Sequence, residues 1–96
     1  MYKVLYMDTL IENLQEIADY LDEIGPSLTD KILTEISERI KSLENMPLRF
    51  PRYIYNRDYR WTSVKSYMIF YKVFEDTKVV QVHRVLHGAR DVQGLL

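Results

Sequence analysis

The sequence Tyr67-Met68-Ile69-Phe70-Tyr71-Lys72-Val73 is followed, after the charged break Glu75-Asp76-Thr77-Lys78, by a second apolar run, Val79 to Leu86. Both runs are rich in aromatic and β-branched residues, and the break between them has the length of a turn. This pattern predicts a β-hairpin. The second run continues into His87-Gly88-Ala89-Arg90-Asp91, so polar and charged side chains follow directly at the end of the predicted sheet.

Two amphipathic helices precede this hairpin. Thr9 and Glu12 form a capping box that starts the first helix, and Gly25-Pro26 ends it, with glycine in a left-handed conformation. Ser27 is expected to cap the second helix. The short link predicts an antiparallel pair whose apolar stripes pack on the sheet. The stripes are Leu10, Ile11, Leu14, Ile17, Ala18, Leu21 and Ile24 in the first helix, and Leu28, Ile32, Leu33, Ile36, Ile40 and Leu43 in the second.

The remaining segments complete an α+β fold. Tyr2 to Met7 reads as an opening strand, residues 47–58 as a basic loop, and Tyr59 to Lys65 as a further strand. The predicted architecture is a single domain, residues 1–96, in which the N-terminal strand and the antiparallel helical hairpin pack on one face of a mostly antiparallel, curved β-sheet.

Alternation along the strands assigns side chains to the two faces of the sheet. We expect Tyr67, Ile69, Tyr71 and Val73 to meet the helices, which would place Arg60 and Lys72 on the opposite, open face. In the last strand, alternation groups Val80, Val82, Arg84 and Leu86 against Val79, Gln81, His83, Val85 and His87.

Charge is distributed unevenly along the 96 residues, although the net charge is only −1. Residues 1–46 hold four Lys or Arg and ten acids (4 − 10 = −6), whereas residues 47–96 hold nine and four (9 − 4 = +5). The basic half favours an acidic partner, either nucleic acid or protein, but a solvated basic loop and an acidic helix face explain the asymmetry equally well.

Several classes of protein are disfavoured by the composition. The sequence has no cysteine and no apolar run of membrane-spanning length, so we expect a cytoplasmic protein with no disulfide and no membrane contact. Two histidines without clustered carboxylates do not make a metal site, and no nucleotide-binding motif is present, so no cofactor is expected.

At this point the chain resembles the RelE/ParE superfamily of toxins from bacterial type II toxin–antitoxin modules. The resemblance is carried by Ser66-Tyr67-Met68-Ile69-Phe70-Tyr71, similar to the family's Y-x-I-x-Y strand, and by His83 to Asp91, similar to its R-V-L-H-G-x-R-D ending. It implies a cognate antitoxin as partner, with a homodimer or a toxin–antitoxin hetero-oligomer as possible assemblies.

The superfamily has two functional branches, and the resemblance implies different residues for each. The RelE-like branch cleaves messenger RNA on the ribosome with basic residues on the open sheet face. Here Met68 occupies the position of an arginine of that set, and Thr62 that of a lysine. If the chain were an endonuclease, its catalytic candidates would be Arg60, His87 and Arg90.

The ParE-like branch poisons DNA gyrase without that cleavage set, and the sequence favours this branch; an inactive family member is a third alternative. Target or partner contacts are expected from Arg49, Arg52, Arg57, Arg60, Lys72 and Arg84, with solvated loop positions and a buried pairing of Arg84 as the alternatives. A structural role is favoured for the motif residues Tyr67, Tyr71, His87, Gly88 and Asp91.

Overall fold

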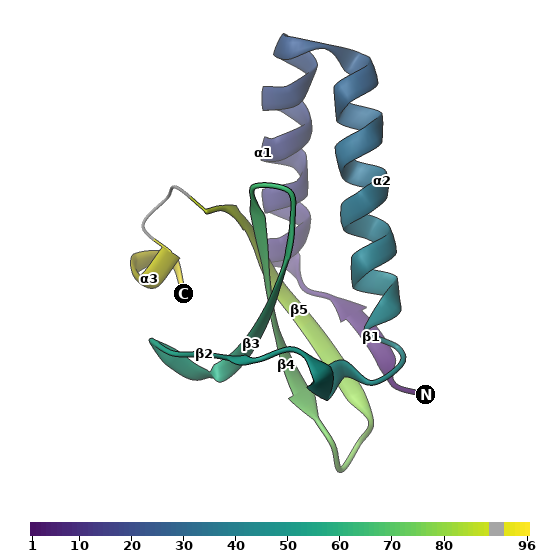
Figure 1. The fold of residues 1–96 in the computed structure, drawn as a ribbon, viewed down its shortest axis with the longest axis vertical. Helices are drawn as coiled ribbons and strands as arrows, with labels where there is room; N and C mark the ends of the chain where they lie inside the picture. Colours follow the sequence, from purple (N-terminus) through teal and green to yellow (C-terminus); the bar gives the residue numbers. More distant parts are fainter. Residues whose placement is uncertain (89–91) are drawn as a thin grey trace.

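A computed structural model describes residues 1–88 and 92–96, and its elements follow the chain in the order shown in Figure 1. Two long helices form a hairpin that stands on a five-stranded sheet, and a short C-terminal helix lies at the other side of the sheet. The elements are β1 (Lys3–Tyr6), α1 (Asp8–Ile24), α2 (Pro26–Ser42), a 3₁₀ turn (Pro47–Arg49), β2 (Arg52–Tyr53), β3 (Asn56–Val64), β4 (Tyr67–Phe74), β5 (Val79–His87) and α3 (Val92–Leu95).

The sheet has the strand order β1-β5-β4-β3-β2. Strands β2 to β5 run antiparallel to their neighbours, whereas β1 lies parallel to β5, with Lys3 opposite Val79. Consecutive antiparallel strands need only short turns, but the parallel pair needs a long crossover, which α1, α2 and the following strands supply. The predicted α+β fold with a mostly antiparallel sheet is therefore confirmed.

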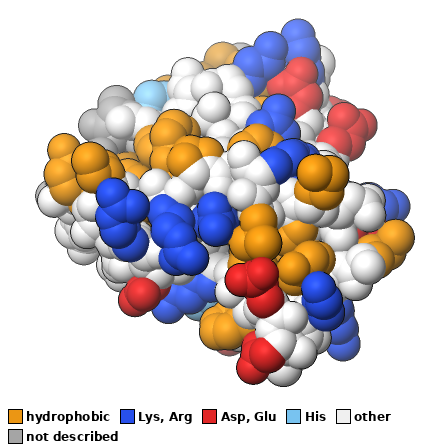
Figure 2. Space-filling model, turned by 60° about the horizontal axis from the view of Figure 1, so that its bottom comes forward, with side chains coloured by type: hydrophobic (Ala, Val, Ile, Leu, Met, Phe, Trp, Pro, Cys, Tyr) orange, Lys and Arg blue, Asp and Glu red, His pale blue; other side chains and the backbone are white. Residues whose placement is uncertain are grey.

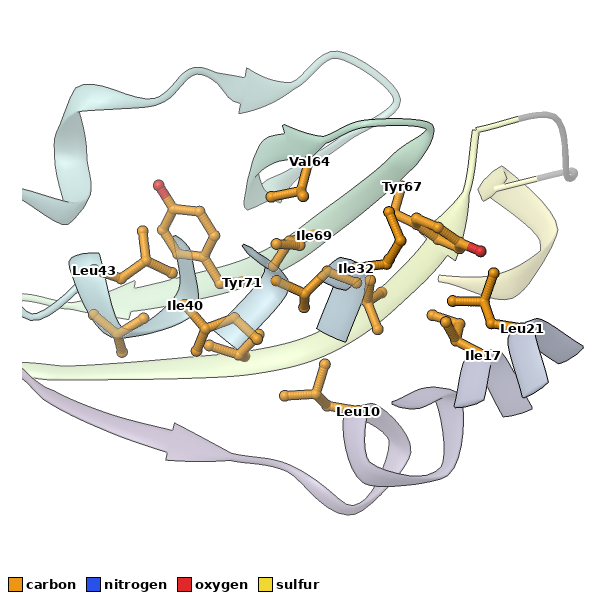
Figure 3. Packing of buried hydrophobic residues seen from close by; sticks show 14 residues of the cluster. Leu10, Ile17, Leu21, Ile32, Ile40, Leu43, Val64, Tyr67, Ile69 and Tyr71 are labelled. Atoms are coloured by element: carbon orange, nitrogen blue, oxygen red, sulfur yellow. The ribbon is translucent and has the colours of Figure 1, made fainter. Parts of the chain in front are cut away.

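The main core lies between the helical hairpin and one side of the sheet, which we call the helix face. Ile36 and Ile40 of α2 are fully buried there against Ile69 and Tyr71 of β4. Figure 3 shows side chains of both helices meeting those of β3 and β4 between the two layers. The expectation that Tyr67, Ile69, Tyr71 and Val73 face the helices is confirmed, Val73 being only partly buried.

The helix ends differ from the sequence prediction. Helix α1 begins at Asp8 with Met7 as its N-cap residue, so Thr9 lies inside the first turn and forms no capping box. Its hydroxyl donates instead to the backbone carbonyl of His83 at 2.6 Å. Since β1 ends at Tyr6, this edge of β5 has lost its strand partner, and the helix side chain supplies the missing hydrogen bond.

The junction between the helices also differs from the expectation. Gly25 has a φ of 173°, which is extended backbone rather than the left-handed conformation. It is both the C-cap residue of α1 and the N-cap residue of α2. Pro26 is the first residue of α2, a position where the backbone N–H that proline lacks would have no partner within the helix. Ser27 therefore lies inside the helix and does not cap it.

The segment predicted as a basic loop, residues 47–58, contains more regular structure than expected. Strand β3 begins at Asn56 rather than at Tyr59, and the two residues of β2 pair with it, Arg52 opposite Arg60 and Tyr53 opposite Asn56. The prediction failed because prolines and arginines dominate this segment, whereas the pairing depends on a turn at Ile54 and Tyr55.

A β-bulge in β5 reverses the alternation halfway along the strand. Tyr71 lies opposite Val82 and Phe70 lies opposite Arg84, so His83 is an extra residue with no partner in β4. Residues directly opposite in an antiparallel pair share a face. Val85 therefore joins Val82 on the helix face, while Arg84 lies on the open face with Phe70, and the predicted grouping of β5 residues is wrong beyond this point.

The open face of the sheet, opposite the helical hairpin, carries a second and smaller cluster. Phe70 is fully buried at its centre, in edge contact with the rings of Tyr53 and Tyr59. Val92 of α3 joins this cluster, so the C-terminal helix covers part of the open face. None of the helices in the described residues has the length and apolar character to cross a membrane.

Candidate functional site

The structure places Arg60 on the helix face, so the expectation that it lies on the open face is wrong. Arg60 is opposite Tyr71, which packs under the helices, and opposite residues share a face. Its guanidinium donates to the backbone carbonyls of Phe50 at 2.8 Å and Leu48 at 3.4 Å. Arg60 therefore holds the segment after α2 against the sheet.

Arg49 closes the C-terminal end of α2. Its guanidinium donates to the carbonyl of Asn45 at 2.6 Å and to the hydroxyl of Ser42 at 3.0 Å. A cation at this end also complements the helix dipole. Arg49 and Arg39 both stack on the ring of Phe50, at 4.5 and 5.6 Å from its centroid.

Tyr71 of β4 also holds the segment after α2 against the sheet. Its hydroxyl donates to the backbone carbonyl of Pro47 at 2.6 Å, and the whole side chain is buried. Burial raises the pKa of Tyr71 to about 12, although the charges of Arg60 and Arg49 act in the opposite direction. The phenol is therefore neutral at physiological pH and acts as a fixed hydrogen-bond donor.

Arg52 and Arg57 lie on the β2–β3 hairpin and are exposed. Arg52 donates to the backbone carbonyl of Arg57 at 2.9 Å, which joins the two strands of this hairpin. The hairpin tip presents Ile54 and Tyr55, which are 69% and 65% exposed. Figure 2 shows Lys and Arg side chains side by side on this end of the molecule with hydrophobic side chains next to them.

Lys72 and Arg84 lie on the open face, where Lys72 was expected. The ammonium of Lys72 lies 4.8 Å from the centroid of the Tyr59 ring. The Tyr59 ring in turn meets the imidazole of His83 edge-on, with centroids 5.5 Å apart. His83 is hydrogen-bonded through Nε2 to the side chain of Gln81 at 3.0 Å. Burial lowers the pKa of His83, and the charges of Lys72 and Arg84 lower it further.

The motif residues Tyr67 and His87 lie together at the far end of the sheet. Their rings meet edge-on with centroids 5.5 Å apart, and both line a hollow of about 410 Å³ beside α1. Burial, followed by the phenol of Tyr20, raises the pKa of Tyr67. The backbone N–H of Gly88 donates to the carbonyl of Ser66 at 2.8 Å and so ties the end of β5 to the β3–β4 turn. Arg90 and Asp91 lie outside the described residues.

The structure does not bring Arg60 and His87 together. Arg60 is opposite Tyr71 and His87 is opposite Tyr67, on the two strands that flank β4. Tyr67 and Tyr71 are four positions apart in β4, which corresponds to about 13 Å along the strand. These two candidates for RNA cleavage therefore do not share one site. In the part of the chain that the structure describes, no three His, Asp or Glu side chains are grouped to hold a metal ion.

Comparison with known proteins identifies the family. The model of the ParE toxin of type II toxin–antitoxin systems (parDE) matches residues 4–92. The chain belongs to this family. No curated protein matches it in a sequence search.

Solved structures of toxins have the same fold as this ParE-family toxin. The chromosomal ParDE system from P. aeruginosa matches with a TM-score of 0.77 and 21% identity, over 91% of this chain and 96% of the other. The RelBE2 toxin–antitoxin complex of Mycobacterium tuberculosis matches with a TM-score of 0.69 and 21% identity, over 90% and 96% of the two chains. The intact RelBE complex of E. coli gives 0.63 and 15%, over 94% and 100%.

Sequence reasoning missed the arrangement around His83 in this ParE-family toxin. Tyr59 and Gln81 were not among the candidate residues, although both contact His83. Strict alternation places Arg84 on the face opposite His83, and only the bulge puts both on the open face. The signal in the sequence was the pair of adjacent polar residues His83 and Arg84, which strict alternation does not explain.

Proposed function

We propose that this type II toxin acts as ParE-like toxins do, by binding DNA gyrase and inhibiting it in the cytoplasm, and that its cognate antitoxin neutralises it by binding the toxin. Inhibition of this kind is a binding activity, so the residues that matter are contact residues rather than proton carriers. Membership of the ParE family is what favours gyrase over the ribosome.

The separation of Arg60 from His87 is the observation that carries this proposal. Cleavage of RNA requires a proton acceptor, a proton donor and positive charge around the same phosphate. Arg60 of β3 is engaged by the carbonyls of Phe50 and Leu48, while His87 is the last residue of β5, four positions further along β4. This arrangement supports a non-catalytic toxin.

The β2–β3 hairpin is the surface that we propose for the target. Residues that dominate binding energy are enriched in aromatic side chains and arginine. The hairpin combines exposed Ile54 and Tyr55 with exposed Arg52 and Arg57. Monomeric proteins bury such apolar side chains when they can, so their exposure at a basic tip favours a contact with an acidic partner surface.

The direct test is to add the purified toxin to gyrase and follow the supercoiling of relaxed plasmid, beside primer extension on mRNA translated in a cell-free system. We expect loss of supercoiling and no ribosome-dependent cleavage. Ribosome-dependent cuts without any effect on gyrase would contradict the proposal and favour the RelE-like alternative.

The His87→Ala variant separates the two activities further. Because His87 lies far from the hairpin tip, we expect this variant to inhibit gyrase nearly as well as the wild type. An endonuclease that uses His87 as its acid or base would lose about 10²- to 10⁴-fold in cleavage rate. Loss of toxicity in cells with this variant, at unchanged protein level, would therefore count against gyrase as the target.

The Tyr55→Ala variant tests the hairpin tip itself. We expect the concentration of toxin that half-inhibits gyrase to rise by about tenfold or more, as for a residue that contributes strongly to an interface. Tyr20→Ala is a matched control, because Tyr20 is 59% exposed but lies on α1. Equal effects of the two substitutions would exclude the hairpin as the contact surface.

A further inference from the structure

A hollow with charged walls lies on the helix side of the molecule, and the proposed gyrase contact does not explain it. It has a volume of about 710 Å³ and is lined by α2, by the segment after α2, and by the end of β3 with the turn that follows. We call it the α2–β3 hollow. Its charged lining residues are Glu35, Glu38, Arg39, Arg49 and Lys65.

Arg39 does not pair with the acid that precedes it in α2. Glu35 lies four residues earlier, the spacing at which a carboxylate and a guanidinium pair along a helix. The guanidinium of Arg39 donates instead to the hydroxyl of Thr62 at 2.6 Å and to the carbonyl of Ser63 at 3.1 Å. Both acceptors are neutral groups of β3. Both bonds come from Nη1, and a guanidinium also carries donors on Nη2 and Nε.

Glu35 pairs with a residue of the sheet rather than with its own helix. Its carboxylate lies 3.9 Å from the ammonium of Lys65, in the turn between β3 and β4, and this is the only ion pair in residues 1–88 and 92–96. Lys65 has a φ of 55°, a left-handed conformation that few residues other than glycine adopt. The turn thus places a lysine beside Glu35, and Arg39 is left with neutral acceptors.

A second guanidinium, that of Arg49, lies at the same hollow. It also donates to neutral groups, the Asn45 carbonyl and the Ser42 hydroxyl. Arg39 and Arg49 share the ring of Phe50, at 5.6 and 4.5 Å from its centroid, and this attraction holds both cations in place although like charges repel. Within the described part of the chain, neither guanidinium has a carboxylate at ion-pair distance. The hollow therefore presents two fixed guanidinium groups to an anion.

The acids in the wall decide which kind of anion fits. Glu35 and Glu38 line the hollow beside the two guanidinium groups. A nucleic-acid strand carries a negative charge on every phosphate, so it would also bring charge against these carboxylates. A protein segment can carry its carboxylates at chosen positions only, and its backbone N–H groups can donate to Glu35 and Glu38. The mixed charge of the wall therefore favours an acidic protein segment over a polynucleotide.

We propose that the α2–β3 hollow is a docking site for an acidic segment of a partner protein, with one carboxylate on Arg39 and a second on Arg49. Guanidinium groups bind carboxylates through forked pairs of hydrogen bonds. In an extended segment, alternate side chains point to the same side and lie about 7 Å apart, which suits two guanidinium groups that share one ring. The site is separate from the hairpin tip, since neither Ile54 nor Tyr55 lines it.

The test is NMR spectroscopy of the arginine Nε–H groups in the full chain, titrated with capped hexaglutamate, capped hexaglutamine and a single-stranded hexanucleotide. We expect hexaglutamate to shift the signals of Arg39 and Arg49, and hexaglutamine to shift neither. The hexanucleotide should act on these two signals with an affinity lower by about tenfold or more, because Glu35 and Glu38 repel it. Signals that hexaglutamate does not move, or an equal response to the hexanucleotide, would overturn the proposal.

Variants separate the hollow from general charge effects. Arg49→Gln should weaken hexaglutamate binding by about tenfold or more, because one carboxylate loses its charged partner. Glu38→Gln, at an exposed residue that the fold does not need, should strengthen it by about two- to fivefold. Lys41→Gln is the matched control, because Lys41 is an exposed cation of α2 outside the hollow. Equal weakening by Lys41→Gln and Arg49→Gln would overturn the site, as would binding that Glu38→Gln leaves unchanged or weakens. Thermal unfolding of each variant checks that the fold is retained.

Discussion

Replacement of Tyr71 by phenylalanine removes one hydroxyl from the centre of the structure. That hydroxyl donates to the Pro47 carbonyl at 2.6 Å, and both residues are fully buried. The variant leaves the carbonyl without this partner, so we expect a loss of about 1–3 kcal/mol in the free energy of unfolding near neutral pH. For a chain of this length, each kcal/mol lowers Tm by about 4–8 °C.

We also predict how the stability difference between the wild type and this variant depends on pH, and its sign follows from the ionisation of the phenol. Burial raises the pKa of Tyr71 from 10.0 in the unfolded chain to about 12 in the folded protein. The neutral phenol therefore stabilises the fold fully below pH 10, and this contribution is lost as the pH rises from 10 to about 12. At about pH 11 the wild type should have lost about 1.4 kcal/mol that the phenylalanine variant does not lose.

Urea unfolding of both proteins at about pH 7.5 and about pH 11 measures this difference directly. The gap in unfolding free energy between wild type and Tyr71→Phe should narrow by the stated amount at the higher pH. Tyr55→Phe is the control, because Tyr55 is 65% exposed and its substitution should change neither value. A gap of equal size at both pH values would refute the raised pKa, and no gap near neutral pH would refute the role of the hydrogen bond.

Two further substitutions test the core and the support of β5. Ile36→Ala should lower the free energy of unfolding by about 2–5 kcal/mol in urea titrations, because Ile36 is fully buried between the layers. Ile24→Ala is the control and should change this free energy little, because Ile24 is 59% exposed. Asn13→Ala should lower Tm by an amount equivalent to about 1–3 kcal/mol, since the Val85 N–H loses its acceptor, and hydrogen exchange of that amide should become faster; unchanged exchange would exclude this role of Asn13.

The sequence predicted the layers of this fold well because one physical rule determines them. Apolar residues such as Ile17, Ile36 and Ile69 recur with the period of their helix or strand, and each period defines a face that must be buried. The orientation of β4 toward the helices followed from the same rule. The helix starts were less predictable, because Thr9 and Ser27 are good capping residues wherever they occur.

The candidate site was predicted less completely, because it depends on how the strands pair with one another. The face of Arg60 depends on its partner in β4, and the face of Arg84 depends on the bulge at His83. Neither feature leaves a periodic trace in the sequence, since both arise from contacts between strands. The resemblance indicated the family, which the match over residues 4–92 shows, but the sequence put Arg60 on the wrong face and grouped Arg84 with the wrong residues of β5.

The pairing of β1 with β5 also has a consequence for folding during translation. Lys3 is opposite Val79, so the partner strand of β1 is synthesised 76 residues later (79 − 3 = 76). Helices α1 and α2 can form while the polypeptide is still being made, but the sheet beneath them is complete only after β5 (Val79–His87) has been synthesised. Until β5 has been synthesised, β1 has no neighbour in the sheet and the helices have no complete surface on which to pack.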